Sequence, residues 1–276
     1  MRIAGISQMR NYQQKVVVIT GAASGIGAAL VGEFSRRGAI VVLLDLDQRA
    51  ADRVCQSLGL DADKSASYKM NVADKRSVET AFKQVLKRFG RIDVLVNNAG
   101  ISHISKFAET DVGVLEKVIQ VNLMGAIYCT RAAIASLVGS RGQVIALSSI
   151  AGFSPLYGRT GYSASKYGLH GFLETLRSEV REYGVDVLLA APAFVKTNIE
   201  KNTLNEAGKV YGTKKALAGK VLTPEFVAEQ IVRAAERQKR LICISPMAKT
   251  ARFVSKFFPT LYERLMYRKI RREFVP

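Results

Sequence analysis

From residue 15 onward, short apolar runs alternate with longer stretches whose apolar residues recur at helical spacing. Residues 15–20 form a β-branched run that gives way to a glycine-containing segment at 21–27. An amphipathic stretch through Leu30 and Phe34 follows, and then a second apolar run at 39–44. Continuous apolar runs are typical of strands buried on both faces of a parallel sheet. The order therefore predicts a strand, a glycine-rich turn, a helix and a second strand.

The same alternation continues through the middle of the chain. Further strand-like runs lie at 92–96 and 144–147. Repeated strand–helix units predict an α/β fold, with an open parallel sheet covered by helices on both faces. With 276 residues and 48% apolar content, the chain can bury one substantial core.

This organisation predicts three segments: an N-terminal extension at 1–14, a single domain at 15–244 and a C-terminal extension at 245–276. The first lacks the apolar centre of a signal peptide, and no run approaches the length that crosses a bilayer. Three scattered cysteines have no metal-ligand spacing and indicate reduced packing residues. We therefore expect a cytoplasmic protein without a metal site, with membrane association left open by its C-terminal extension.

The glycine segment has the sequence context of a phosphate-binding turn. Its glycines permit tight backbone geometry, and the amides at the start of the following helix attract a pyrophosphate. Asp45 ends the next strand, eighteen residues after Gly27. A carboxylate there can accept hydrogen bonds from ribose hydroxyls and repel a 2′-phosphate, which favours NAD over NADP. The alternative is that Asp45 only starts a turn with Asp47.

Tyr162 and Lys166 lie four residues apart, thirteen residues after Ser149. On a helix this spacing places the phenol and the ammonium on one face. A phenol has a reference pKa of about 10, and a nearby cation lowers that pKa toward neutrality, as proton transfer requires. Ser149 could hold the same reacting oxygen. The alternative is a helix with a surface Tyr and Lys, and a serine that caps the end of a strand.

On the basis of these residues, the chain resembles the short-chain dehydrogenase/reductase family from about residue 15 to residue 244. The segment 20–27 resembles the cofactor loop of that family, and 97–100 matches its Asn-Asn-Ala-Gly run. Asn71 stands where the family usually has Asp, although an amide oxygen can accept the same hydrogen bond. Residues 192–197 resemble the segment that holds the nicotinamide, with Ala193 in place of the usual Gly.

The resemblance implies a Rossmann-type, doubly wound parallel sheet of about seven strands. It also implies an NAD(P)-dependent enzyme, NAD preferred, that interconverts a secondary alcohol and a ketone. Tyr162 would be the general acid/base, Ser149 would orient the substrate oxygen, Lys166 would bind the nicotinamide ribose and lower the tyrosine pKa, and Asn122 would support a water chain. The residues expected at the cofactor are Gly21, Ser24, Gly25, Ile26, Gly27, Asp45, Asn71, Val72, Asn98, Ala99, Gly100, Tyr162, Lys166, Pro192, Val195 and Thr197.

A formal net charge of +18 raises the question of an anionic partner. Much of the excess lies near the C-terminus, where Pro259 is a good start for an amphipathic helix. That helix would carry one basic stripe beside an apolar sector formed by Leu261, Tyr262, Leu265 and Met266. A basic amphipathic helix with aromatic residues suits an anionic membrane surface. Packing on the core or on a sister subunit is an equal alternative, and nucleic-acid binding is a weaker one.

Three segments should face the substrate because ligands lie beyond the C-terminal ends of the strands: 101–106, 151–161 and a lysine-rich lid at 198–220. His103 could line this cleft. A weaker likeness to the family branch that acts on steroids, retinoids and long-chain lipids favours a lipophilic alcohol or ketone. A homodimer or homotetramer is expected by analogy. The competing hypotheses are a catalytically idle dinucleotide-binding scaffold and a basic protein that binds a membrane or nucleic acid.

Overall fold

The computed structural model describes residues 9–196, 202–211 and 221–271. Its centre is a seven-stranded sheet in the order β3-β2-β1-β4-β6-β7-β9, and every pair of neighbours is parallel. The strands are β1 (Val16–Thr20), β2 (Ile40–Asp45), β3 (Ser65–Lys69), β4 (Val94–Asn97), β6 (Gln143–Leu147), β7 (Asp186–Ala191) and β9 (Leu241–Cys243). The predicted doubly wound parallel sheet is confirmed, because the strand order reverses direction at β1 and β4.

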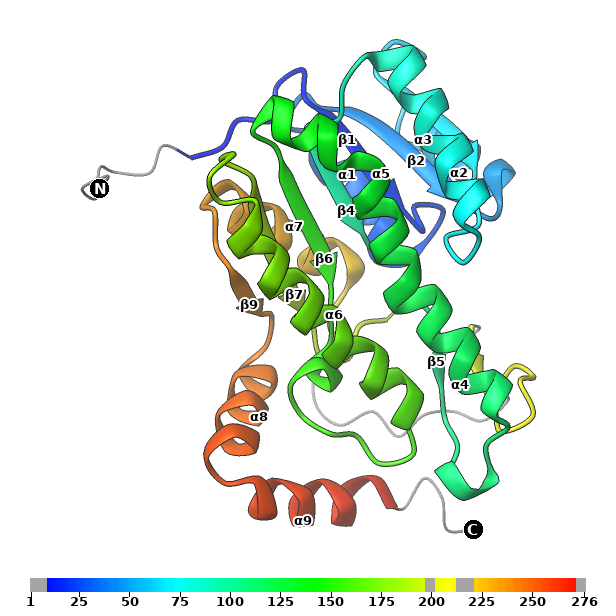
Figure 1. The fold of residues 1–276 in the computed structure, drawn as a ribbon, viewed down its shortest axis with the longest axis vertical. Coiled ribbons are helices and arrows are strands. Elements are labelled where there is room, and N and C mark those ends of the chain that lie inside the picture. Colours follow the sequence, from blue (N-terminus) through cyan, green and yellow to red (C-terminus); the bar gives the residue numbers. More distant parts are fainter. Residues whose placement is uncertain (1–8, 197–201, 212–220, 272–276) are drawn as a thin grey trace.

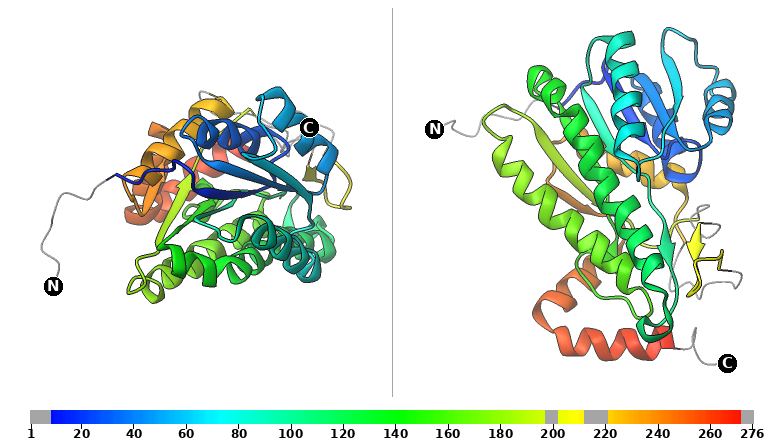
Figure 2. Two further views of the ribbon diagram at one scale, coloured as in Figure 1. Left: turned by 90° about the horizontal axis from the view of Figure 1, so that it is seen from above. Right: turned by 45° about the vertical axis from the view of Figure 1, so that its right-hand side comes forward.

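Helices cover both faces of this sheet (Figures 1 and 2). The core on one face is built with α1 (Gly25–Ser35), α2 (Gln48–Ser57) and α7 (Pro224–Glu236). The core on the other face is built with α3 (Lys75–Phe89), α5 (Gly125–Ser140) and α6 (Thr160–Glu179). Along β1, Val17 and Ile19 join the first core whereas Val16 and Val18 join the second. Since successive side chains of a strand point to opposite faces, a strand covered on both sides must be apolar throughout.

Short elements connect these layers at the C-terminal ends of the strands. They are β5 (Ser102–His103), which pairs in parallel with β8 (Thr203–Leu204), and the short helical turns η1 (Phe107–Glu109) and η3 (Ile150–Gly152). A further helix, α4 (Val112–Ile119), continues through a π-helical turn, η2 (Gln120–Met124), into α5. The π turn contains a residue expected at the active site, as such turns frequently do.

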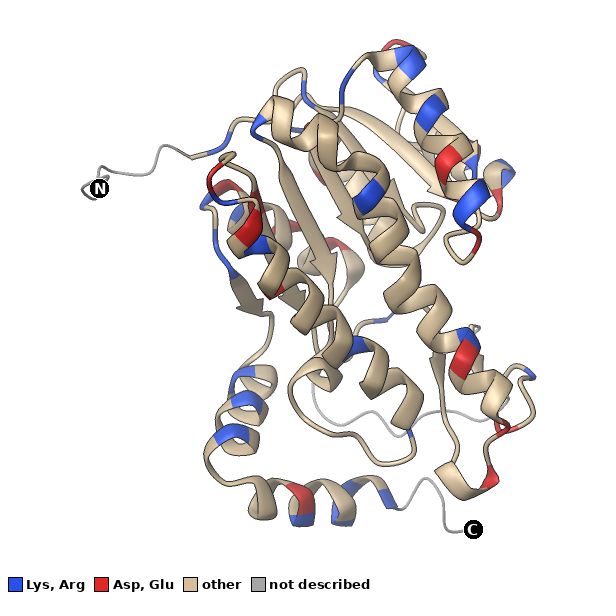
Figure 3. Cartoon of the chain, in the orientation of Figure 1, with Lys and Arg blue, Asp and Glu red and all other residues tan. Residues whose placement is uncertain are grey.

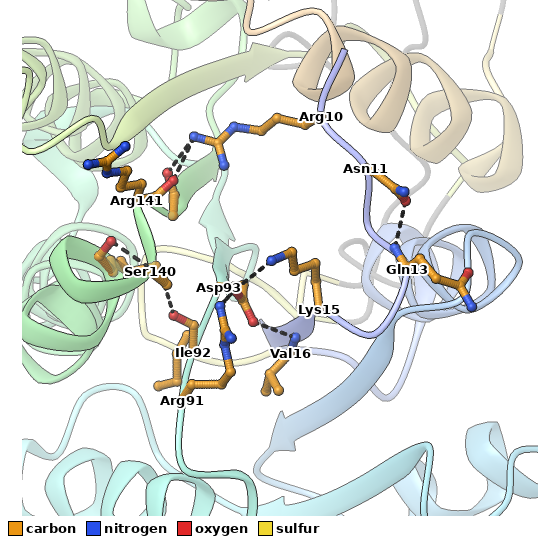
Figure 4. Close-up of polar contacts among 12 residues, drawn as sticks. Arg10, Asn11, Gln13, Lys15, Val16, Arg91, Ile92, Asp93, Ser140 and Arg141 are labelled. Carbon is orange, nitrogen blue, oxygen red and sulfur yellow. Dashed lines mark hydrogen bonds and ion pairs between the residues drawn. The ribbon is translucent and has the colours of Figure 1, made fainter. Parts of the chain in front are cut away.

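Polar contacts around Asp93 join the strands at their N-terminal ends, opposite the expected ligand site (Figure 4). The Asp93 carboxylate accepts a hydrogen bond from the Val16 backbone N–H at 2.9 Å and forms ion pairs with Lys15 and Arg91. Asp93 is 3% exposed, so its charge needs these partners. The cluster therefore joins β1 to β4 where no ligand is expected.

The described part of the predicted N-terminal extension packs against the same domain. Tyr12 is buried against Phe34 and donates a hydrogen bond to the Gln143 side chain at 2.9 Å. Arg10 forms an ion pair with Asp186 at 2.8 Å. A domain boundary at residue 15 stays a prediction, and Tyr12 of this segment belongs to the core of the domain that it precedes.

One helix in the described part of the chain, Val112–Ser140, is long and apolar enough to cross a membrane by length and composition. This differs from the sequence expectation that no run approaches that length. The physical reason lies in its packing. Ala126, Cys129, Ala133 and Leu137 of this helix belong to the core under the sheet, and a buried core helix passes the same test of length and composition.

The predicted C-terminal extension forms two helices, α8 (Pro246–Phe257) and α9 (Pro259–Ile270). The start of a helix at Pro259 is confirmed, with proline at its first position. The two helices cross the end of the molecule that lies beyond the C-terminal ends of the strands (Figure 1). They therefore face the region where a ligand is expected.

Candidate active site

The glycine segment turns sharply between β1 and α1. Gly21 and Gly25 have φ angles of +63° and +54°, which residues with a side chain rarely adopt. A Cβ atom on Gly27 would lie only 2.1 Å from the Gly21 carbonyl oxygen, so the helix can approach the strand this closely only with glycine. Within the described part of the chain, no side-chain hydrogen bond caps the start of α1, and Ser24, Gly25 and Ile26 line a cavity there, which fits the pyrophosphate of a dinucleotide.

Asn98 fixes the conformation of this turn. Its side-chain Nδ2 donates hydrogen bonds to the carbonyl oxygens of Thr20 and Gly21, both at 2.9 Å. Its backbone N–H donates to the Thr20 hydroxyl at 3.0 Å. Asn98 also lines the cavity described below. Its side chain thus supports the loop, a role that the sequence motif alone did not identify.

Asp45 lies at the end of β2 beside the glycine turn. Its carboxylate accepts hydrogen bonds from the Ala23 N–H at 2.9 Å and the Asp47 N–H at 3.2 Å. Asp47 separately accepts from Ala50 at the start of α2. Asp45 thus stabilises the turn and also lines the cavity. Its carboxylate can accept further hydrogen bonds from ribose hydroxyls.

Three of the four residues expected to be catalytic, Ser149, Tyr162 and Lys166, lie around the start of α6 and the end of β6. Lys166 is buried, and its Nζ donates to the Leu147 carbonyl oxygen at 2.7 Å. The same Nζ lies 5.8 Å from the centroid of the Tyr162 ring. Ser149 hydrogen-bonds to Tyr162, and its hydroxyl also accepts from the Ala151 N–H at 3.2 Å. Ser149 thus caps a short helical turn and also contacts the phenol.

The pKa values of these groups differ from the sequence expectation. Burial raises the pKa of the Tyr162 phenol, and the hydrogen bond from Ser149 and the charge of Arg159 only partly oppose this. Burial lowers the pKa of Lys166 to about 8. At Tyr162 the loss of solvation outweighs the nearby charges, so the direction of the pKa shift is opposite to the lowering expected from an adjacent ammonium.

Asn122 lies in the π-helical turn, deeper than the other three. Its side chain accepts from the Ile101 N–H and donates to the Ile101 carbonyl, both at 2.9 Å, and also donates to Ser165 Oγ at 3.0 Å. A small cavity of about 10 Å³ separates Asn122 from Lys166. That volume is close to what one water molecule needs.

A single cavity of about 970 Å³ joins the parts of the site. Most of the residues expected at the cofactor or in catalysis line it: Gly21, Ser24, Gly25, Ile26, Asp45, Asn71, Val72, Asn98, Ala99, Gly100, Ser149, Tyr162, Lys166, Pro192 and Val195. Gly27 lies behind the glycine turn, Asn122 lines the smaller cavity, and Thr197 lies outside the described residues. The cavity is large enough for a dinucleotide and a substrate side by side.

The chain matches the family model described as short chain dehydrogenase over residues 15–208. The chain belongs to the short-chain dehydrogenase family. Dehydrogenase/reductase SDR family member 7B of Bos taurus is 32% identical over 275 residues, which cover 96% of this chain and 85% of that protein. The protein of the same name from Xenopus laevis is 34% identical over 262 residues, covering 92% and 81%.

Solved structures of short-chain dehydrogenases share the fold. One from Burkholderia phymatum, in complex with NAD, has a TM-score of 0.82 at 25% identity and covers 92% of this chain and 96% of its own. An alcohol dehydrogenase from Thermococcus sibiricus, complexed with 5-hydroxy-NADP, has a TM-score of 0.70 at 25% identity and covers 84% and 96%. Similar proteins thus bind either type of nicotinamide cofactor, and the choice in this short-chain dehydrogenase depends on its own residues.

Sequence reasoning missed the contribution of the C-terminal helices of this short-chain dehydrogenase to its cavity. Nine of their residues line it: Met247, Thr250, Ala251 and Val254 from α8, and Tyr262, Leu265, Met266, Lys269 and Ile270 from α9. The apolar sector predicted for the helix after Pro259 was the available signal. Sequence periodicity identifies such a face, and only the fold shows what the face contacts.

The structure corrects the expectation for His103 and describes only part of the predicted lid. His103 is fully buried and does not line the cavity. Its Nε2 accepts a hydrogen bond from the Gly161 N–H at 2.9 Å, next to Tyr162. Of the lid, residues 202–211 form β8 and a turn beside β5, and Asn202 lines the cavity. Residues 197–201 and 212–220 lie outside the described residues.

Proposed function

We propose that the protein is an NAD(H)-dependent oxidoreductase that interconverts a lipophilic secondary alcohol and its ketone, with Tyr162 as the general acid/base. The observation that carries this proposal is the shared cavity. It contains the glycine turn and Asp45 at one end, Ser149, Tyr162 and Lys166 in the middle, and the apolar faces of α8 and α9 beyond them.

The residues of the cavity fit a dinucleotide. Residues of the turn line the cavity at the start of α1, where backbone amides would attract the pyrophosphate. Asp45 would accept hydrogen bonds from the adenosine ribose and repel a 2′-phosphate, which supports NAD over NADP. A bound nicotinamide would supply or accept the hydride.

The protein would supply the proton and hold the substrate. Tyr162 would donate its phenolic proton to the carbonyl oxygen of a ketone, while Ser149 holds the same oxygen by a hydrogen bond. Lys166 would bind the nicotinamide ribose. Asn122 would support a water in the small cavity beside Lys166, through which the phenol regains a proton. Each of these groups already lies within or beside one cavity, so little reorganisation is needed.

The pKa of Tyr162 bears on the direction of the reaction. Because burial raises that pKa, the phenol carries its proton at neutral pH, which suits the reduction of a ketone. Oxidation of an alcohol requires the phenolate as a base. We therefore expect the rate of oxidation to increase with pH across the alkaline range while reduction is favoured near neutrality.

The substrate end of the cavity supports a lipophilic molecule. Leu156, Val254, Leu265 and Met266 line it with apolar atoms. Lipophilic substrates gain about 0.8 kcal/mol for each buried CH₂ group. The weaker family likeness to enzymes of steroids, retinoids and long-chain lipids agrees with this chemistry, and we propose a homo-oligomer of cytoplasmic location by analogy with the family.

Replacing the proposed proton donor tests the mechanism. We expect Tyr162→Phe to bind NADH like the wild type and to lose activity by a factor of 10² or more, the usual contribution of a general acid. The matched control is Tyr167→Phe, an exposed tyrosine on the same helix, which should keep full activity. NADH absorbance across a panel of ketones measures turnover. Comparable turnover by Tyr162→Phe would discard Tyr162 as the proton donor.

A further inference from the structure

The helices α8 and α9 present two different faces. Their inner faces line the cavity, and their contacts with the segment before α6 hold them in place. Ser154 Oγ lies 2.7 Å from Ser255 Oγ, and the Tyr157 N–H lies 3.2 Å from Met266 Sδ. The inner faces thus belong to the cavity and to contacts with the rest of the domain. A partner at the molecular surface would bind the outer faces of these two helices.

An exposed apolar cluster lies where α8 meets α9. Four large side chains form this cluster, which we term the aromatic corner: Phe253, Phe257, Phe258 and Leu261, with exposed fractions of 58%, 57%, 53% and 50%. The rings of Phe253 and Phe257 lie 4.9 Å apart, and Phe258 lies 6.4 Å from Phe253. Single exposed apolar residues are common, whereas a contiguous exposed cluster marks an interaction site.

The aromatic corner is surrounded by positive charge. Between residues 245 and 271 seven basic side chains accompany a single acid, Glu263, and six of them lie outside the cavity lining. We term these six the basic face: Lys249, Arg252, Lys256, Arg264, Arg268 and Arg271. All six are exposed. Figure 3 shows these two helices at the end of the molecule opposite α3, with few acidic side chains near them. An apolar tip within a basic surface fits an anionic lipid bilayer.

A second copy of the chain fits this surface poorly. A two-fold interface places the same patch against itself, so six cations would face six cations with one acid on each side. A nucleic acid would satisfy the basic face but would leave the apolar atoms of the aromatic corner in water. A bilayer satisfies both, because phosphates contact the basic face while the rings enter the interface.

We propose that the outer face of α8 and α9 docks the protein on an anionic lipid surface through the aromatic corner and the basic face. The inner faces of the same helices line the cavity, so docking places the cavity wall against the bilayer. If the proposed function holds, a lipophilic substrate then passes between the membrane and the cavity without crossing water.

Sedimentation with vesicles tests the docking without measuring catalysis. We expect the wild-type protein to sediment with phosphatidylcholine vesicles that contain phosphatidylserine and to remain in solution with phosphatidylcholine alone. The variant Arg264→Gln/Arg268→Gln/Arg271→Gln should bind on the order of 100-fold more weakly, since each basic residue near an anionic surface contributes about 1 kcal/mol. The matched control, Arg76→Gln/Lys83→Gln/Lys87→Gln on α3, should bind like the wild type.

A second set of variants tests the aromatic corner. Phe253→Ser/Phe257→Ser should weaken binding even at low salt, whereas Phe107→Ser, an exposed phenylalanine elsewhere with a 66% exposed fraction, should not. Far-UV circular dichroism and NADH titration verify that each variant is folded. The proposal would be overturned if both sets of variants sedimented with anionic vesicles like the wild type. It would also be overturned if the wild-type protein did not bind anionic vesicles.

Two other outcomes would assign the face to another partner. Size-exclusion chromatography with light scattering would reveal a subunit contact if Phe253→Ser/Phe257→Ser turns a dimer into a monomer while vesicle binding is unchanged. Binding of an oligonucleotide that the arginine variant loses, without any binding to vesicles, would indicate a nucleic-acid surface. Loss of activity in Tyr162→Phe with normal vesicle binding would separate the docking from the proposed function.

Discussion

At the scale of single residues, Asp45 carries the proposed preference for NAD over NADP. Asp45 contributes a carboxylate that both the loop and a ribose can use. We expect Asp45→Ala to weaken NADH binding about tenfold or more, because a hydrogen bond to a charged group contributes about 1.5–3 kcal/mol. The same change should reduce the discrimination against NADPH. Fluorescence titration with both cofactors measures the effect, and Asp47→Ala is the control. Tighter binding of NADPH than NADH by the wild type would contradict the assignment.

His103 holds the backbone next to Tyr162 by a hydrogen bond from Gly161. Its Nε2 can accept the Gly161 N–H only while the ring is neutral, and burial lowers its pKa to about 4. The unfolded chain binds a proton near pH 6.5 that the folded chain does not, so the free energy of unfolding should fall as the pH drops from about 6.5 to 4.

We expect this loss to reach about 3 kcal/mol at the acidic end of that range. In His103→Gln the side chain can still accept the hydrogen bond but cannot titrate. Urea unfolding at pH 7 and pH 5 should therefore show a smaller difference for His103→Gln than for the wild type. Equal pH dependence in the two proteins would remove His103 from this role. His170 has a lowered pKa too, and it remains present in both proteins.

At the scale of elements, α9 forms one wall of the cavity without contributing a fully buried residue. We expect removal of residues 259–276 to leave NADH binding intact while raising the KM for lipophilic ketones by at least about tenfold, since the apolar wall is lost. Turnover of a short, water-soluble ketone should change little. Removal of residues 272–276 alone is the control. An unchanged KM for lipophilic ketones would show that α9 has no part in substrate binding.

At the scale of the whole molecule, ligand binding and folding are linked. NADH at about 100 times its Kd adds about 2.7 kcal/mol to the free energy of unfolding, which corresponds to a rise of about 5 °C in Tm for a protein of this size. Gly27→Ala should abolish that rise because a Cβ there meets the Gly21 carbonyl oxygen. Gly139→Ala, where no atom lies within 4 Å of the added Cβ, should keep it. Thermal denaturation with and without NADH measures both. The absence of any rise for the wild type with either cofactor would contradict a dinucleotide site.

Local patterns in the sequence were sufficient for the sheet and the glycine turn, whereas the roles of the residues around Tyr162 were expected from the family resemblance. Buried strands require continuous apolar runs and tight turns require glycine, so both can be identified from neighbours in the chain. The tertiary structure decided what no local pattern contains. His103 is buried beneath α6 because β5 passes there, and the long apolar helix Val112–Ser140 packs under the sheet. The apolar face of α9 was predicted, but its position over the cavity depends on contacts between residues about a hundred positions apart, as between Tyr157 and Met266. Burial likewise raises the pKa of Tyr162, and burial is a property of the folded chain alone.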